Sequence, residues 1–275
     1  MMLHPDRLTA LEDVILEFNQ AAADVALPLF RADHGLENKG GDPGLNAFDP
    51  VTAADKGAEA AIRRLIAQKF PDHGVIGEEY GEDRPDAEFV WVLDPIDGTR
   101  SFISGLPLWC VLIGLRHEGR PVLGSIGQPY LDEVYLGHAG GSRLVSRGTS
   151  RPLKVRPCPR LTDATISSTD PDACFNGAEL GAWTQVRAAS RLARLGLDAY
   201  AYAMVAAGAM DMVVEAGLKS WDIEAAIPVI EGAGGMVTDW RGQPVGGAGG
   251  QVVIVGDQAC LDEALVALRR SARTA

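Results

Sequence analysis

Residues 89–107, FVWVLDPIDGTRSFISGLP, set a wholly apolar run directly before a cluster of acidic, turn-forming and small residues. The first five residues are aromatic, β-branched or aliphatic without alternation, which is typical of a strand buried on both faces. Asp94 therefore stands at the end of a buried strand. Pro95 and Gly98 then predict a tight turn that holds Asp94 and Asp97 close together.

Two carboxylates held this close in a partly dry site repel each other unless a cation compensates their charge. A divalent metal ion is the simplest such cation. The alternative is structural, because Asp-Pro and Asp-Gly pairs often form turns: Asp94 would then make an Asx turn and Asp97 would cap a helix. Further acids in similar settings along the chain favour the metal site.

Acidic residues also stand near the start of an expected helix. Thr52 can cap a helix that runs to about Phe70, with apolar residues at helical spacing. Asp49 and Asp55 lie beside this start. Taken alone, these two acids could simply be placed there because negative charge favours the positive end of the helix dipole.

Two more segments bring acids to the ends of elements. Residues 74–79, GVIGEE, predict a short apolar strand that ends in two glutamates. If this strand neighbours the one before Asp94 in a single sheet, Glu78 lies beside Asp94. Asp222 falls in the first turn of an expected helix that continues to about Ile230. Alone, the glutamates could be solvated loop charges and Asp222 a helix cap.

The rest of the chain predicts an α/β fold in two halves. Residues 1–150 indicate an α+β half, with a long amphipathic helix at 6–30 and closely spaced strands of an antiparallel sheet from about Leu108. Residues 151–275 indicate an α/β half, because strands and helices alternate. We predict that the two halves form one compact catalytic unit. Loops are expected at 35–48, where the chain should be mobile, at 80–88 and at 243–250.

Composition and charge exclude several classes of function. The chain has 275 residues, and its 37 Asp and Glu against 25 Lys and Arg give a net charge of −12, which argues against a nucleic-acid partner. No run of about 18 apolar residues is present, so no membrane span is expected. The N-terminus has no secretory pattern, and the four cysteines lack zinc or redox spacing. We therefore expect a cytoplasmic protein.

Together these motifs resemble the inositol monophosphatase family of metal-dependent phosphomonoesterases. The strongest matches are GEE at 77–79, DPIDGT at 94–99 and WD at 221–222, in the order and spacing of that family, with DPVTAAD at 49–55 upstream. The resemblance covers nearly the whole chain. It implies a layered α-β-α-β-α sandwich, a homodimer, and Mg²⁺-dependent hydrolysis of a small phosphorylated alcohol.

The resemblance also implies a role for each site residue. Two to three Mg²⁺ ions, which prefer oxygen ligands, would be held by Glu78, Asp94, the carbonyl oxygen of Ile96, Asp97 and Asp222, with Glu79 near a weaker third site. Asp55 and Thr99 would help Glu78 to orient the attacking water. Backbone N–H groups of Gly98 and Thr99 would meet the phosphate. The implied reaction is an in-line attack of metal-activated water on a phosphate monoester.

The residues that would face the leaving alcohol depart from the inositol-type pattern. Where those enzymes carry a Gly-Ser/Thr-Ala-Ala run, residues 196–199 of this chain are GLDA. An acid at Asp198 suits a cationic alcohol better than a neutral polyol. This region, together with residues 102–107, resembles the histidinol-phosphatase branch of the family. Glu215, in contrast, stands where inositol-type enzymes have an equivalent acid.

We therefore predict a histidinol-phosphate phosphatase, with an inositol-1-monophosphatase as the alternative. In a purely structural alternative, Asp198 caps the following helix and Tyr200 and Tyr202 pack in the core. A phosphatase for bisphosphorylated nucleotides or sugars is a more distant prediction, because no basic cluster for a second phosphate is evident. A catalytically silent relative is the last alternative, and the presence of the full set of acids argues against it.

Overall fold

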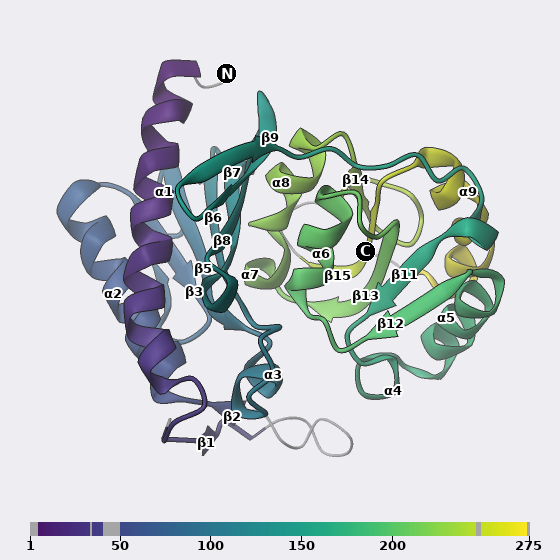
Figure 1. Cartoon of the computed structure of the whole chain (residues 1–275), viewed down its shortest axis with the longest axis horizontal. Coiled ribbons are helices and arrows are strands. Elements are labelled where there is room, and N and C mark those ends of the chain that lie inside the picture. Colours follow the sequence, from purple (N-terminus) through teal and green to yellow (C-terminus); the bar gives the residue numbers. More distant parts are fainter. Residues whose placement is uncertain (1–4, 34, 41–49, 246–248, 274–275) are drawn as a thin grey trace.

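The computed structural model describes residues 5–33, 35–40, 50–245 and 249–273 (Figure 1). Asp49, most of the loop predicted at 35–48 and part of the loop predicted at 243–250 lie outside the described residues. Within the described ranges, none of the helices combines the length and the apolar character needed to cross a membrane.

Helices and sheets stack in five layers, so the predicted α/β fold with α-β-α-β-α layering is confirmed (Figure 1). The two sheets are the second and fourth layers. The helices of the first, third and fifth layers are, in pairs, α1 (Pro5–Ala26) and α2 (Ala53–Lys69), α6 (Ala199–Ala206) and α8 (Ala226–Gly232), and α5 (Gly177–Ala189) and α9 (Gln258–Leu268). Shorter helices are α3 (Thr99–Ile103), α4 (Pro171–Cys174), α7 (Ser220–Ile223), and the 3-10 turns Leu27–Leu29, Pro129–Leu131, Leu161–Asp163 and Arg269–Ser271.

The larger sheet has eight strands in the order β10-β9-β8-β7-β6-β5-β3-β4. These strands are β3 (Gly74–Gly77), β4 (Gly81–Asp83), β5 (Phe89–Asp97), β6 (Cys110–His117), β7 (Arg120–Gln128), β8 (Glu133–His138), β9 (Gly141–Ser146) and β10 (Thr149–Pro152). β3 and β5 are neighbours, which is the arrangement that would bring Glu78 beside Asp94. They run parallel with Gly77 opposite Leu93, while the other pairs are antiparallel.

Two predicted loops contain strands. Residues 81–83 form the edge strand β4, and β1 (Glu37–Asn38) pairs with β2 (Pro50–Val51) in a separate two-stranded sheet. All residues of β1 and β4 are exposed. Because backbone pairing with one neighbour, and not burial, holds these strands, neither has the apolar pattern by which a strand is recognised in a sequence.

The smaller sheet has five strands in the order β12-β11-β13-β15-β14. They are β11 (Thr165–Ser168), β12 (Leu192–Leu195), β13 (Met212–Leu218), β14 (Met236–Thr238) and β15 (Gly250–Val255). β11 runs parallel to β12 and β13, and β15 runs antiparallel to β13 and β14. The alternation of strands and helices beyond residue 153 agrees with the sequence pattern.

Burial on both faces of the sheets explains the uninterrupted apolar runs. In β5, Trp91 and Leu93 face α1 and α2, whereas Val90 and Val92 pack on the other face with Ile76. In β13 and β15, alternate residues face either the third-layer or the fifth-layer helices. Each sheet therefore has apolar side chains packed on both of its faces, as expected for strands covered on each side.

The helix predicted from residue 217 to 230 is divided into α7 and α8. Pro228 has no backbone N–H, and its ring would clash with the carbonyl of Glu224 in one continuous helix. In the first turn of α8 the missing donor costs nothing, since first-turn N–H groups have no partner inside the helix. Asp222 consequently lies in a short helix, α7, next to a turn.

Candidate active site

A cavity of about 360 Å³ lies where β5, β13 and the starts of α3, α6 and α7 meet. Residues from both predicted halves line it. Its acidic residues are Glu78, Asp94, Asp97, Asp198, Glu215 and Asp222, and its other lining residues include Ile96, Gly98, Thr99, Arg100, Thr169, Cys174 and Tyr202. The fold thus places acids that are distant in sequence around one space.

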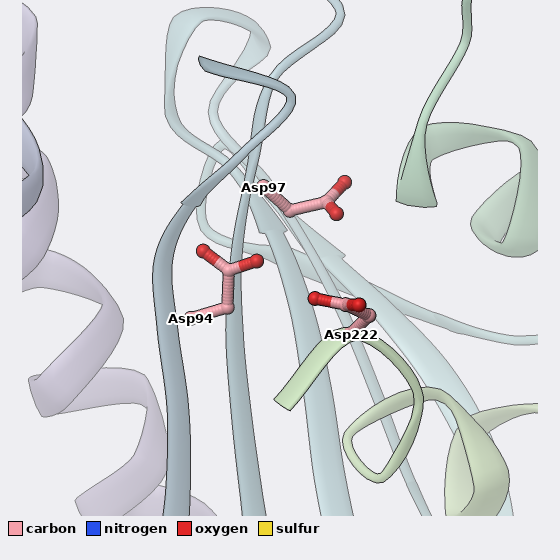
Figure 2. A group of neighbouring side chains, drawn as sticks. All are labelled: Asp94, Asp97 and Asp222. Atoms are coloured by element: carbon pink, nitrogen blue, oxygen red, sulfur yellow. The ribbon is translucent and has the colours of Figure 1, made fainter. Parts of the chain in front are cut away.

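Asp94, Asp97 and Asp222 form a compact group in this cavity (Figure 2). Each offers one carboxylate oxygen, and the three oxygens lie within 4.8 Å of one another. Asp94 and Asp97 come from the end of β5, and Asp222 comes from α7. Figure 2 shows Asp94 and Asp97 on one stretch of chain and Asp222 beside them on the neighbouring helix.

The turn after β5 is held by bonds within the turn itself. Oδ1 of Asp94 accepts the N–H of Ile96 at 3.1 Å, and the hydroxyl of Thr99 lies 3.1 Å from the carbonyl oxygen of Ile96. Gly98, with φ of +83°, lies in the left-handed region and directly precedes α3. Asp94 therefore makes the Asx turn of the structural alternative, but a carboxylate has further acceptor positions that can serve a cation.

The other two aspartates are fixed by backbone N–H groups of the C-terminal half. Oδ2 of Asp97 accepts the N–H of Ala199 at 2.7 Å, and Oδ2 of Asp222 accepts the N–H of Lys219 at 2.6 Å. Asp97 is not the cap of α3, because Gly98 occupies that position. These bonds hold the two carboxylates in place within the group of three aspartates.

Asp55 and Thr99 are within hydrogen-bond distance, as the resemblance implies. The Thr99 hydroxyl lies 3.2 Å from Oδ1 of Asp55. Oδ2 of Asp55 accepts the N–H of Thr52 at 2.8 Å and its hydroxyl at 2.6 Å; Thr52 caps α2 as predicted, and Asp55 completes a capping box with it. The capping interaction and the contact with Thr99 use different oxygens, so both functions of Asp55 are compatible.

Glu78 and Glu79 face a cation that sequence reasoning missed. Nζ of Lys39 lies 3.1 Å from Glu78 and 2.5 Å from Glu79. Burial alone would lower the pKa of Lys39, but attraction by the two glutamates outweighs it and raises that pKa. Glu78 lines the cavity but is not part of the compact group of three aspartates.

A buried glutamate on α2 positions the turn that carries these acids. Glu59 accepts the N–H of Glu79 at 2.8 Å and the N–H of Tyr80 at 3.2 Å, and it pairs with Arg63 at 2.7 Å. A Cβ atom at Gly77 would lie 2.1 Å from the Glu59 carboxylate. Gly77 is therefore required for this close approach, and the GEE motif has a packing reason as well as a chemical one.

Asp198 and Glu215 line the same cavity as the aspartate group. The Ser101 hydroxyl donates to Oδ2 of Asp198 at 3.0 Å, and a Cβ atom at Gly98 would come within 2.7 Å of the same oxygen. Asp198 makes no cap bond to α6, so the capping alternative is wrong. Glu215 accepts the N–H and the hydroxyl of Thr169 at 2.9 and 3.0 Å.

The two tyrosines after Asp198 have different environments. Tyr202 is buried and lines the cavity, whereas the Tyr200 hydroxyl donates to Glu133 at 3.2 Å. Thr169, Arg100 and Cys174 were not singled out in the sequence, although they line the same cavity. No local pattern marks these three residues, because they come from segments that meet only in the fold: Arg100 from α3, Thr169 from directly after β11 and Cys174 from α4.

Burial raises the pKa of every acid in the aspartate group. The pKa values of Asp94 and Asp97 lie well above the ordinary range, first because of burial and then because of repulsion by neighbouring carboxylates. Burial raises the pKa of Asp222 to about 6 and that of Glu215 to about 8. The donors are all oxygens, the set that hard divalent cations such as Mg²⁺ prefer, so the cluster fits a metal of this class.

We expect the stability of the metal-free protein to fall as pH rises from about 5 to about 8. The folded-state pKa values of Asp222 and Glu215, about 6 and about 8, exceed the ordinary values of 3.8 and 4.5. In this window the folded chain holds protons that the unfolded chain has released, and deprotonation therefore destabilises the fold.

Tm measured in EDTA across the pH range tests this, and added Mg²⁺ should raise Tm more at the alkaline end. A Tm in EDTA that is flat or rises with pH would contradict the expectation.

The chain is similar to known phosphatases in sequence and in fold. A model of the inositol monophosphatase family matches residues 8–274. The bifunctional phosphatase IMPL2, chloroplastic, of Arabidopsis thaliana is 40% identical over 240 residues, 86% of this chain and 66% of the plant protein. The histidinol-phosphatase of Chlorobaculum parvum is 37% identical over 194 residues, 70% of this chain and 74% of that one. A solved inositol monophosphatase from Zymomonas mobilis superposes with a TM-score of 0.81 at 37% identity, covering 94% of this chain and 99% of that one.

Proposed function

The chain belongs to the inositol monophosphatase family of phosphatases, and we propose that its reaction is the Mg²⁺-dependent hydrolysis of histidinol phosphate to histidinol and phosphate. The observation that carries the choice of substrate is Asp198, an acid in the cavity wall that is turned away from its own helix. The likeness to a histidinol-phosphatase over 70% of the chain supports it.

The environment of Asp198 supports a role in recognition. Its φ of 47° lies in a region that non-glycine residues rarely adopt. Its carboxylate faces the cavity beside Gly98, with one hydroxyl donor from Ser101. Histidinol carries an ammonium group and an imidazole, whereas inositol carries only hydroxyl groups. A carboxylate in the wall therefore attracts the first alcohol electrostatically and gains little from the second.

Two or three Mg²⁺ ions would be held by Glu78, Asp94, the carbonyl oxygen of Ile96, Asp97 and Asp222, with Glu79 beside the third. When bound, such ions neutralise phosphate charge and lower the pKa of water. The ion pair between Lys39 and Glu79 would have to break before a third ion could bind there, because the Lys39 ammonium lies 2.5 Å from that carboxylate. The number of ions bound is thus linked to the position of Lys39.

The remaining residues would position the substrate and the water. The N–H groups of Gly98 and Thr99 lie at the start of α3, where backbone donors attract a phosphate oxygen. The hydroxyl of Thr99 lies within reach of Asp55, and can accept a hydrogen bond from a water while its own proton goes to the carboxylate. We propose that Asp55, Thr99 and Glu78 together hold this water opposite the leaving alcohol.

Phosphate release from histidinol phosphate and from inositol 1-phosphate, measured side by side, tests the proposed substrate. We expect release in Mg²⁺ and none in a chelator, with kcat/KM higher for histidinol phosphate. A preference for the inositol ester would retain the metal-dependent reaction and reduce Asp198 to a structural residue. No release from either ester in Mg²⁺ would contradict the proposal and favour another phosphate ester or a silent relative.

We also propose that residues 1–150 and 151–275 act as one catalytic unit, and that the protein is a cytoplasmic homodimer. The four cysteines are free thiols, as in a reducing compartment. The edge strand β12 exposes Leu192 and Leu195, which would suit a contact with a second chain. The mass in solution, compared with 29.1 kDa for one chain, tests the dimer.

A further inference from the structure

Asp222 is the one member of the aspartate group that comes from the smaller-sheet half, and its placement depends on how α7 and the turn after it lie on the larger sheet. Trp221 packs against the cluster of Ile76, Val90 and Val92 on that sheet. On the other side of Asp222, the turn between α7 and α8 contacts β6 and β7. The chain on both sides of Asp222 is therefore held by the opposite half of the molecule.

Glycines allow this turn to approach the sheet directly. A Cβ atom at Gly124 would lie 2.0 Å from the carbonyl oxygen of Ala225, and one at Gly114 would lie 3.2 Å from the Ala225 nitrogen. Gly114 and Gly124 are opposite each other in the β6–β7 pair. The backbone of the turn therefore contacts the backbone of the sheet directly at these glycines. Because glycine has no side chain, this contact does little to determine the position of the turn along the strands.

One bidentate ion pair joins the larger sheet to this turn. The Nε of Arg116 on β6 donates to Oε2 of Glu224 at 2.6 Å, and its Nη2 contacts Oε1. The Glu224 side chain is 1% exposed and that of Arg116 is 19% exposed. A bidentate guanidinium–carboxylate pair is geometrically specific, and Glu224 is two residues from Asp222.

We infer that Arg116 is a positioning residue for Asp222: by holding Glu224, it sets the α7 carboxylate at the distance from Asp94 and Asp97 that a metal ion requires. The inference rests on the proposed metal site. Arg116 is not a catalytic residue, because it does not line the cavity. Its effect is expected on metal affinity more than on the hydrolysis step once metal is bound.

Calorimetric titration of the full chain with Mg²⁺ tests the inference. In Arg116→Met the buried Glu224 loses its partner and the turn should shift, so we expect the Kd for Mg²⁺ to rise about 10-fold. Arg116→Lys retains the charge without the fork and should recover part of the affinity. At saturating Mg²⁺, kcat should stay within about 3-fold of that of the natural chain.

Arg156→Met is the matched control. Arg156 makes a similar bidentate pair with Asp211, at 2.7 and 2.5 Å, and the Asp211 side chain is also 1% exposed. Neither residue of this pair lines the cavity. The control should lower Tm without changing the Kd for Mg²⁺.

The outcomes separate the two proposals. If Arg116→Met and Arg156→Met lower Tm alike and neither changes the Kd, Arg116 is only structural and the inference is overturned. If the natural chain itself binds no Mg²⁺, the proposed metal site fails first. Should Arg116→Met not fold, Glu224→Gln, which keeps the shape of the side chain, replaces it in the titration; an unchanged Kd in that variant and in Arg116→Lys would equally overturn the inference.

Discussion

Replacement of Asp94 by Asn should lower phosphate release by about 10³-fold or more, while the metal-free protein becomes more stable. Asp94 is 3% exposed and belongs to the group of three aspartates. An amide has the shape of the carboxylate but no negative charge, and its nitrogen cannot bind a cation. Stabilisation of phosphate charge by metal ions contributes several kcal/mol, and about 4 kcal/mol corresponds to about 10³-fold in rate.

The variant should be more stable than the natural chain without metal, because burial and then repulsion by neighbouring carboxylates disfavour the ionised form of Asp94 and raise its pKa. The amide removes one of the mutually repelling charges, and its oxygen can still accept the N–H of Ile96. Tm in EDTA at about pH 8 should therefore rise, since this is where the carboxylates are most ionised. The stabilising effect of added Mg²⁺ should largely disappear.

Both quantities can be measured on the same samples, with phosphate release giving kcat/KM and thermal unfolding giving Tm. Asp86→Asn makes the same chemical change at an exposed residue outside the cavity and should leave both unchanged. An Asp94→Asn variant that remains as active as the natural chain would overturn the metal assignment. A large fall in Tm would instead point to a structural role for the ionised carboxylate.

The parts of the fold that could be predicted are those governed by short-range patterns. The uninterrupted apolar run at 89–93 predicts a strand covered on both faces, and Thr52 with Asp55 predicts the start of α2. The neighbouring positions of β3 and β5 also followed from two short strands that each end in acids. In these cases the residues that determine the structure lie within a few positions of it.

The parts that could not be predicted depend on contacts between residues far apart in sequence. Lys39 meets Glu78 and Glu79 only after β1 pairs with β2, and its own surroundings in the sequence carry no apolar or motif pattern. Arg116 and Glu224 are 108 positions apart, and the sequence around each of them predicts only a charged residue at the surface. The division of α7 from α8 was accessible in principle, because Pro228 alone excludes a continuous helix.

Asp198 shows a limit of a different kind. Its place directly before a helix fits a capping acid, and nothing in the local sequence says which way the carboxylate turns. In the structure the N–H groups of Tyr200 and Ala201, which a capping side chain would accept, lie near the backbone carbonyl oxygens of Leu197 and Asp198. The N–H of Ala199 bonds to Asp97, and the Asp198 side chain turns to Ser101 and the cavity.

Replacement of Asp198 by Asn should lower kcat/KM for histidinol phosphate by about 10-fold to 100-fold and that for inositol 1-phosphate by less than about 3-fold. Hydrogen bonds to charged groups contribute about 1.5–3 kcal/mol, and each 1.4 kcal/mol corresponds to about 10-fold. Asn keeps the shape of the side chain and an acceptor for Ser101, so the cavity wall should retain its form.

The ratio of kcat/KM for the two esters, measured at saturating Mg²⁺, isolates recognition from the reaction itself. Asp170→Asn is the matched control: Asp170 caps α4 and lies 3.6 Å from Arg100, so the variant removes the same charge near the cavity but outside its wall. Because Asn caps a helix as well as Asp, this control should change neither value by more than about 3-fold.

Equal losses for both esters in Asp198→Asn would mean that Asp198 acts through its neighbour Asp97 or through Gly98, and would remove the argument for a cationic substrate. A loss confined to histidinol phosphate would support the proposal that the charge of the leaving alcohol is recognised at this wall.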